Sequence, residues 1–382
     1  MPALFIVYVL IGPAAWGLLL FGMTMGNRRM NKLERFGEQV LPEPVPTLCV
    51  VVPAKDEAGH VRRTLDSVLA MDYPAGAMRV IAVNDRSDDE TGAILDELAE
   101  ADERVTAVHV GTLPDGWLGK CHALHVATDG GAGVDADWLL FVDSDVIVEP
   151  AAARTAVGVS VARTYDAVSL LSRVEPQSFV ERWLVPVCGA TWATLGLISR
   201  TNEGKSRVAA ANGQFFLVRR VAYVDVGGHE AVKDRITEDV ALMRLLKRRL
   251  HIVKLFHGGH LVSTRMHATW RQVRHGWARI YTGTTEGRLW PIVIAATLAA
   301  TAVLPLGLVW LGEGWTVAAG LHGAFVLVWL AFVYRGNRSS PGLALLAPAT
   351  LVAMTVVLLN AVRRGLTGTV DWRGSAVTQR RG

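Results

Sequence analysis

Cysteine is scarce in this sequence, and the few cysteines present show no paired spacing. The 382 residues include three, Cys49, Cys121 and Cys188, and no CxxC motif. So few cysteines exclude a disulfide framework and favour a reducing compartment. The sequence also lacks internal repeats and low-complexity tracts, which excludes a repeat architecture.

Charged residues are scarce as well. They make up 19% of the chain, while hydrophobic residues make up 51% and the mean hydropathy is +0.29. Such a chain is too apolar for an ordinary soluble domain and too charged for membrane helices alone. The formal net charge is +4 and the isoelectric point is near 9.1, which in a membrane protein reflects Lys and Arg beside membrane segments. We therefore expect a soluble domain joined to membrane segments, and no nucleic-acid partner.

One uncharged stretch lies at the N-terminus. Residues 3–25 contain no charged side chain and are long enough to cross a bilayer core of about 30 Å. Arg28, Arg29 and Lys32 follow this stretch, and no basic segment precedes it, which is not the order of a cleaved signal peptide. We expect a retained anchor, a cytoplasmic domain from residue 27 onward, and a multi-pass protein of the cell membrane.

Three further apolar stretches lie near the C-terminus, at about 290–311, 315–334 and 341–362. Arg335 and Arg338 place the loop between the second and third on the cytoplasmic side. A full crossing by the last stretch would put an arginine-rich tail outside, against the same rule. The last stretch contains Pro348, so it either crosses or is re-entrant, and we expect two to three C-terminal transmembrane segments.

Two other segments are predicted to be helices that do not cross the membrane. Residues 183–199 carry no charge, but motifs on both sides of them must meet, so we predict an interfacial or buried helix. Residues 265–283 place Trp270, Trp277 and Tyr281 on one helical face with arginines beside it. This pattern is typical of a basic helix in an anionic membrane surface, and packing against the soluble domain is the alternative. We therefore divide the chain into an N-terminal anchor at 1–26, a soluble domain at 27–262 and an interfacial region at 263–289. Membrane segments at 290–364 and a tail at 365–382 follow.

Residues 47–260 alternate strand and helix patterns. Apolar runs such as TLCVVVP, MRVIAV and DWLLFV are separated by segments with apolar residues at helical spacing. Continuous apolar strands between helices predict an α/β fold with a mostly parallel sheet covered on both faces. Ligands of such sheets bind beyond the carboxyl ends of the strands.

Acidic residues follow three of the predicted strands. In strand order they are Asp56 and Glu57, then Asp85, Asp88 and Asp89, then Asp143 and Asp145. For Asp88 and Asp89, helix capping and a role in ligand binding are equally good explanations. Capping does not account for Asp143 and Asp145, because these alternate residues flank a turn and the apolar segment VIVEP follows them. Left alone, two such carboxylates would repel each other until the pKa of one rose and it took a proton. Mg²⁺ or Mn²⁺, which binds one or two carboxylates plus substrate phosphates, removes that repulsion, so we predict a metal on Asp143 and Asp145.

Six segments resemble, in the same order, those of family 2 glycosyltransferases. They span most of residues 47–280 and read VVVPAKDE, VNDRSDDET, GWLGKCHAL, FVDSD, AAANGQFFLVRR and ITEDVAL. The resemblance implies a GT-A domain, which is Rossmann-like with a mostly parallel sheet, and a nucleotide diphosphate sugar as donor.

The resemblance also implies roles at the donor side. Pro53, Asp56 or Glu57, and Asp85 would hold the base and ribose. Asp85 suits a uracil N–H, since an ionised carboxylate only accepts hydrogen bonds, so a UDP-sugar is expected. Lys120 would approach the diphosphate as a point charge.

Further roles follow at the reacting centre. Asp143 and Asp145 would hold the metal, with Asp143 also near the sugar and ribose. Asp239 would be the general base that deprotonates the acceptor, which inverts the anomeric centre, and Glu238 is the rival base. Gln214 is expected to contact the sugar from the acceptor side of the pocket.

The acceptor is expected to be a membrane lipid. Processive polysaccharide synthases carry Q-x-x-R-W near this point, and Gln272 is not followed by that pattern. The segments GWARI and DWRG resemble instead the branch linked to hopanoid and carotenoid glycosylation, which implies a lipid hydroxyl or carboxyl acceptor. The alternatives are a processive polysaccharide synthase, a metal-dependent nucleotidyltransferase, for which no Gly-rich loop is present, and a non-catalytic membrane scaffold.

Some side chains keep two interpretations. His229 is either a core or turn residue or an acceptor contact. His257 and His260 suggest a metal pair, but no third ligand is evident. Trp117 either stacks on a sugar or packs in the core.

Overall fold

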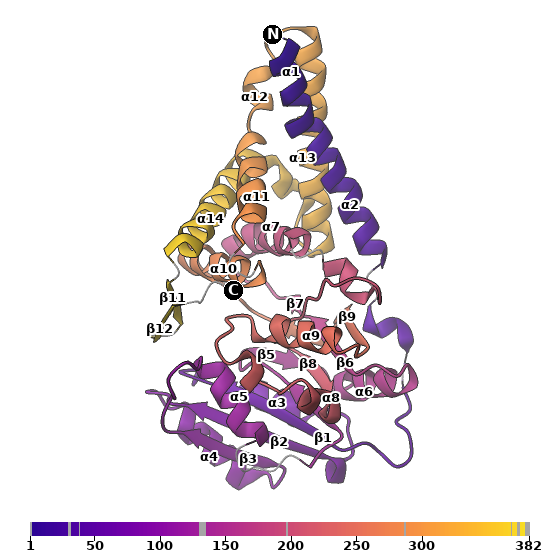
Figure 1. The fold of residues 1–382 in the computed structure, drawn as a ribbon, viewed down its shortest axis with the longest axis vertical. Helices are drawn as coiled ribbons and strands as arrows, with labels where there is room; N and C mark the ends of the chain where they lie inside the picture. Colours follow the sequence, from indigo (N-terminus) through magenta and orange to yellow (C-terminus); the bar gives the residue numbers. More distant parts are fainter. Residues whose placement is uncertain are drawn as a thin grey trace. The chain divides into compact units, whose positions relative to one another are not determined.

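The chain folds into two compact units in the computed structural model (Figure 1). The structure describes residues 2–29, 32–37, 39–129, 135–195, 198–285, 288–367, 369–372 and 375–378. The sheet unit comprises Met30–Glu175 and Arg200–Arg265. The helical unit comprises Met1–Arg29, Pro176–Ser199 and Met266–Gly382, so residues 176–199 belong to it although the predicted boundaries place them in the soluble domain.

The sheet unit is built on a seven-stranded sheet with the order β3-β2-β1-β4-β8-β6-β9. All neighbouring strands are parallel except that β8 runs antiparallel to β4 and β6. The predicted mostly parallel α/β sheet is therefore confirmed. The strands are β1 (Leu48–Ala54), β2 (Met78–Asp85), β3 (Val105–Val110), β4 (Trp138–Phe141), β6 (Ala167–Leu171), β8 (Phe216–Arg219) and β9 (Val253–His257).

The central strand β1 shows why the strand patterns are continuously apolar. All seven of its residues are buried. Successive side chains point to opposite faces of a sheet, so Val50 and Val52 join one hydrophobic cluster while Cys49 and Val51 join the other. Both faces of the sheet are thus covered at β1, which explains why this strand is continuously apolar.

Helices cover both faces of the sheet. Val61 and Leu65 of α3 belong to the same cluster as Val50, and Ala123 and Leu124 of α5 belong to the same cluster as Val51. A second sheet, with the order β5-β10-β7, completes the unit. The other α-helices and strands of the unit are α3 (Val61–Leu69), α4 (Thr91–Ala101), α5 (Gly119–Asp129), α6 (Ala152–Ala162), α8 (Arg220–Asp225), α9 (Glu238–Arg248), β5 (Val146–Val148), β7 (Arg173–Val174) and β10 (Val262–Thr264).

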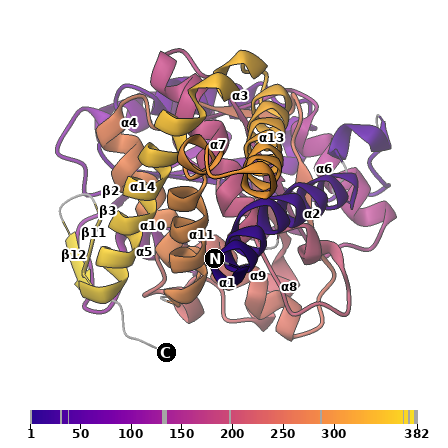
Figure 2. The same ribbon diagram turned by 90° about the horizontal axis from the view of Figure 1, so that it is seen from above.

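The helical unit contains the predicted membrane segments. Within the described part of the chain, four helical stretches are long and apolar enough to cross a membrane: Ala3–Gly26, Trp290–Leu308, Glu313–Gly336 and Pro341–Thr367. Figure 2 shows α11 beside α14 and α2 beside α13. The elements are α1 (Pro2–Val9), the π-helical turn η1 (Leu10–Ala14), α2 (Ala15–Arg29), α7 (Phe179–Leu195), α10 (Trp270–Thr284), α11 (Trp290–Thr301), α12 (Pro305–Leu308), α13 (Glu313–Gly336), η6 (Pro341–Leu346), α14 (Ala347–Thr367) and the hairpin strands β11 (Thr369–Trp372) and β12 (Ser375–Thr378).

Pro348 does not break the last apolar stretch. It lies in the first turn of α14, where the missing N–H removes no intrahelical hydrogen bond. The stretch Pro341–Thr367 reaches 27 residues, which is enough for a full crossing by length.

The helix α7 of the helical unit contains most of the uncharged segment predicted at residues 183–199, preceded by Glu181 and Arg182. Pro186 lies inside it, and its residues 184–188 are buried. The Tyr281 hydroxyl of α10 donates to the Cys188 carbonyl at 3.0 Å, and the Trp192 indole donates to Thr284 at 2.9 Å. The segment was predicted to be an interfacial or buried helix; α7 is helical and is buried along residues 184–188. Residues 196–197 of the predicted segment lie outside the described residues.

The aromatic face of α10 is covered within the same unit. Thr269 and Gln272 form a capping box at its start. Val273, Trp277 and Tyr281 are buried, while Trp270 is 37% exposed. The apolar face therefore packs on neighbouring helices, and the prediction of a membrane-surface position now rests on Trp270 and the basic edge of the helix.

Candidate active site

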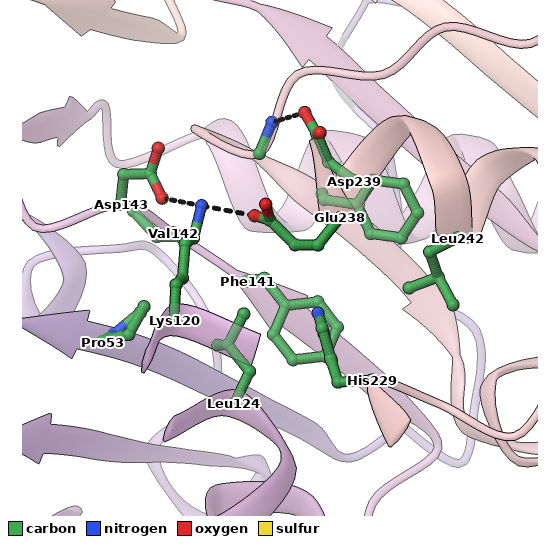
Figure 3. Close-up of a pocket in the computed structure, with 12 residues that line it drawn as sticks. Pro53, Lys120, Leu124, Phe141, Val142, Asp143, His229, Glu238, Asp239 and Leu242 are labelled. Atoms are coloured by element: carbon green, nitrogen blue, oxygen red, sulfur yellow. Dashed lines mark hydrogen bonds and ion pairs between the residues drawn. The ribbon is translucent and has the colours of Figure 1, made fainter. Parts of the chain in front are cut away.

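A pocket of the sheet unit lies at the carboxyl ends of β1 and β4, where the acidic residues were predicted to meet. Its lining combines a hydrophobic floor with one ammonium and three carboxylates (Figure 3). The lining residues are Pro53, Lys120, Leu124, Phe141, Val142, Asp143, Gly213, Phe216, His229, Glu238, Asp239 and Leu242.

Lys120 is the electrostatic centre of the pocket. Its Nζ lies 2.6 Å from Asp143 Oδ1 and 2.6 Å from Glu238 Oε1 (Figure 3). Burial lowers the pKa of Lys120, but the charges of Asp143, Glu238 and Asp239 outweigh it and raise that pKa well above its ordinary value. The side chain is therefore a fixed ammonium that joins the end of β4 to the start of α9.

Asp239 lies beside Lys120 and Glu238 and is held by backbone N–H groups. Its Oδ2 accepts from the Gly213 backbone N–H at 2.6 Å, and its Oδ1 accepts from the Val240 N–H at 2.8 Å. Burial and the Glu238 charge raise the pKa of Asp239 to about 7, against the opposing effect of Lys120. A carboxyl with a pKa near neutrality can exchange protons at working pH, which suits a general base.

Gly213 allows these groups to approach one another. A Cβ at this position would lie 3.1 Å from Lys120 Nζ, 3.4 Å from Glu238 Oε1 and 3.5 Å from Asp239 Oδ2. The loop before β8 therefore runs directly against all three charged side chains. This loop contains the family-like segment AAANGQ, and its glycine eases the close approach, since a Cβ there would press on the Lys120 ammonium.

Asp143 and Asp145 follow β4 with Ser144 between them. Burial raises the pKa of Asp145 to about 7, and the charges of Asp143 and Glu57 add to this rise. Among the residues whose side chains are described, no cation forms an ion pair with Asp145. A divalent cation would relieve this repulsion, and carboxylate oxygens are the donors that Mg²⁺ and Mn²⁺ prefer, so the residues fit such an ion. The described residues contain no group of three or more His, Cys, Asp or Glu placed to hold a metal, so water and substrate phosphates would complete its coordination.

Asp85 lies buried at the end of β2. Its Oδ1 accepts from the Arg86 guanidinium at 2.8 Å. The first residue of α5 lies against this pair, because a Cβ at Gly119 would be 2.4 Å from Asp85 Oδ2. The sequence reasoning missed Arg86; its only local signal is a basic residue inside an otherwise acidic strand-end motif.

The other acids after β1 and β2 brace the two loops. Asp56 Oδ1 accepts from the Asp88 N–H at 2.8 Å, and Asp89 accepts from the Ala58 N–H at 3.1 Å and the Thr91 N–H at 2.9 Å. Asp89 is not the N-cap of α4, because Glu90 occupies that position and Thr91 begins the helix. Its carboxylate still accepts from the first N–H of the helix, and it also ties down the loop after β1. Asp56 does not line the pocket, and its predicted contact with a nucleotide stays a prediction.

The residues with two interpretations are also placed. His229 donates to or accepts from the Tyr223 hydroxyl at 2.8 Å, and burial lowers its pKa to about 3, so it is a neutral part of the pocket floor. Trp117 packs with His125 at a centroid distance of 4.8 Å. Gln214 lies outside the pocket lining and accepts from the Asn212 side-chain amide at 3.0 Å.

The comparisons with known proteins agree with this fold and site. The model of the family described as "Glycosyltransferase like family 2" matches residues 46–282, more than half of the chain, and the protein belongs to this family. It is an enzyme, a glycosyltransferase.

Two relatives and one solved structure illustrate the similarity. The 4,4'-diaponeurosporenoate glycosyltransferase of Staphylococcus aureus strain USA300 is 22% identical over 377 residues, covering 94% of this chain and 95% of the relative. The enzyme of the same name from strain MRSA252 is 24% identical over 290 residues, covering 73% of this chain and 72% of the relative. The mannosyltransferase PcManGT of Pyrobaculum calidifontis, solved with GDP-Man and Mn²⁺, matches with a TM-score of 0.52 at 19% identity and covers 94% of this chain and 99% of that one, which supports the GT-A fold.

Proposed function

We propose that this enzyme transfers one sugar from a nucleotide diphosphate sugar to the hydroxyl or carboxyl group of a membrane lipid, with inversion at the anomeric carbon. The main support is the arrangement of Lys120, Asp143, Glu238 and Asp239, which places a proton acceptor beside a fixed positive charge. The relatives named for 4,4'-diaponeurosporenoate support a lipid acceptor. The helical unit, with four stretches able to cross a membrane, supports a reaction at a membrane surface. We place it at the cytoplasmic face of the cell membrane because Arg28, Arg29 and Lys32 follow the first apolar stretch.

The proposed reaction is a single displacement. The acceptor oxygen attacks the anomeric carbon while Asp239 takes its proton, and the bond from that carbon to the diphosphate oxygen breaks with its electron pair. The nucleoside diphosphate leaves with the charge that develops. Lys120 stabilises that charge, because its ammonium is held in place before the reaction begins.

The donor side of the proposal concerns Asp85 and the carboxylates after β4. Asp85 would hold the base and ribose with Pro53, Glu57 and Asp56, and a UDP-sugar remains the predicted donor. A Mg²⁺ or Mn²⁺ ion on Asp143 and Asp145 would supply positive charge to the diphosphate. The solved mannosyltransferase with GDP-Man and Mn²⁺ supports a divalent ion and a nucleotide sugar of this general kind.

Lipid analysis tests the function directly. The full-length protein, expressed in a host that lacks it, is expected to yield an extractable lipid heavier by one sugar residue than in cells with the empty vector. Mass spectrometry of the extract and of the soluble products measures both outcomes. Label in a polymer would favour the polysaccharide synthase, and released pyrophosphate in place of nucleoside diphosphate would favour the nucleotidyltransferase.

The substitution Gly119→Ala tests the place of Asp85 in donor binding. The new Cβ would lie 2.4 Å from Asp85 Oδ2 and 2.8 Å from Arg86 Nη2, so the pair must move. We expect the KM for the nucleotide sugar to rise about tenfold, the effect of losing about 1.4 kcal/mol of binding, with kcat nearly unchanged. Gly76→Ala is the matched control, because nothing lies within 4 Å of its Cβ. An unaltered KM in Gly119→Ala would remove Asp85 from the donor site.

A further inference from the structure

The helical unit contains a cluster of arginines that form no ion pair with an acid among the residues whose side chains are described. Arg274 on α10 and Arg364 near the end of α14 approach the ring of His275 from its two sides. Arg274 Nη2 lies 3.0 Å from His275 Nε2, and Arg364 Nη2 lies 3.0 Å from His275 Nδ1. The two helices are neighbours in both views (Figures 1 and 2), and the Asn360 side chain of α14 donates to the Arg274 carbonyl at 3.0 Å.

The chemistry of the imidazole ring shows that this cluster has too few acceptors. A neutral imidazole has one acceptor nitrogen and one N–H. A guanidinium has donors only, so just one of the two arginines can donate to His275. The N–H of the other arginine then faces the N–H of the imidazole ring. Protonation of His275 would leave no acceptor at all. Burial and the charges of Arg274, Arg364 and Arg271 lower the pKa of His275, which agrees with a neutral ring surrounded by cations.

A second donor in the cluster is also unused. Arg274 Nε is buried and has no hydrogen-bond partner among the described residues. Neither Arg274 nor Arg364 forms an ion pair with a carboxylate in the part of the chain whose side chains are described. The negative end of the α14 dipole accounts for a cation at Arg364, since Arg364 is in the last turn, but it does not account for Arg274 on another helix.

We infer that Arg274 and Arg364 bind the phosphate group of an anionic phospholipid. A phosphate supplies acceptor oxygens for the unused donors, and guanidinium groups match phosphate geometry in a bidentate way. The lipid is favoured over a dissolved phosphate by position. Arg364 lies at the end of Pro341–Thr367, a stretch able to cross a membrane, and α10 exposes Trp270. Basic residues directly beside a membrane helix bind anionic headgroups, and aromatic side chains are common at the same depth.

Native mass spectrometry of the full-length protein in neutral detergent tests the site. Dioleoyl phosphatidylglycerol is expected to bind the wild-type protein, and dioleoyl phosphatidylcholine is not. In R274Q/R364Q the affinity for phosphatidylglycerol is expected to fall about thirtyfold, the effect of two basic residues near a membrane surface. The control R335Q/R363Q removes the same charge from two exposed arginines of the helical unit that do not contact His275, and its affinity is expected to fall much less than that of R274Q/R364Q.

The remaining outcomes also decide the inference. Equal loss in R335Q/R363Q would show a general charge effect and overturn the site. Inorganic phosphate that displaces the lipid at similar concentration would show a site for a dissolved anion and overturn the lipid as occupant. If R274Q/R364Q does not fold, the single variant R364Q, at the end of a helix, is expected to weaken binding about fivefold, and unchanged binding would refute the proposal. This inference does not depend on the proposed sugar transfer, because the experiment measures lipid binding and not enzyme activity.

Discussion

Asp239→Asn is expected to lower the transfer rate by about 10²–10⁴-fold, the usual contribution of a positioned general base. Asparagine keeps the size of the side chain and can still accept from the Gly213 N–H, so the loop before β8 stays in place. It cannot take a proton from the acceptor hydroxyl. The rate is measured as lipid product formed in membranes, and the KM for the nucleotide sugar is expected to change little, because the loss concerns the transition state.

The dependence of the rate on pH separates Asp239 from its rival. The base must be deprotonated to act, and its pKa is about 7, so the wild-type rate should fall as the pH drops below about 7. This fall of the rate is the acidic limb of the pH profile. In Glu238→Gln the acidic limb should move to lower pH, because the Glu238 charge is one of the causes that raise the pKa of Asp239. Asp239→Asn should remove the limb. A wild-type rate in Asp239→Asn, together with the loss of the limb in Glu238→Gln, would make Glu238 the base.

Lys120→Met is expected to have the second large effect, on stability as well as activity. Removing the ammonium leaves Asp143 and Glu238 without their shared partner at 2.6 Å, beside Asp239. Breaking a buried ion pair costs about 3–5 kcal/mol; a fifth of the Lys120 side chain is exposed, so we expect about 2–4 kcal/mol of local stability to be lost. Hydrogen exchange of β1 and β4 in the full-length protein measures this loss.

Two further variants show whether the effect belongs to the charge pair. Lys205→Met removes an exposed lysine of the sheet unit and should leave exchange unchanged. The double variant K120M/E238Q should lose less stability than the two single changes added together, since it removes both partners. Additive losses would mean that Lys120 stabilises the unit by packing alone. Transfer activity is expected to stay low in both variants that lack Lys120, because no ammonium then meets the diphosphate.

The strand pattern was enough to predict the sheet but not the direction of every strand. β1 and β4 could be recognised because both faces of the sheet are covered, which makes their sequences continuously apolar. β8 is also fully apolar at its centre, yet it runs antiparallel to both neighbours. Burial alone does not distinguish the two directions, so the sequence contained no signal for this reversal.

For the acidic residues, too, the sequence pattern predicted their location but not their contacts. Their place after successive strands predicted one functional edge, because parallel strands end on the same side of a sheet. The sequence did not show that Asp56 and Asp89 brace two loops, nor that Lys120 lies between Asp143 and Glu238, which follow it by 23 and 118 residues in the numbering. Contacts over such separations depend on how helices and loops pack at the sheet edge.

By itself, the sequence determined the covered parallel sheet, the apolar stretches long enough to cross a membrane and the chemical types present at the strand ends. These properties follow from local spacing and from the free energy of removing side chains from water. Only the tertiary structure decided which carboxylate is held by Lys120 and which is left with a pKa near neutrality, and which arginines of α10 and α14 share one histidine. Electrostatic effects depend on distance and burial, and both are set by packing between residues far apart in the chain.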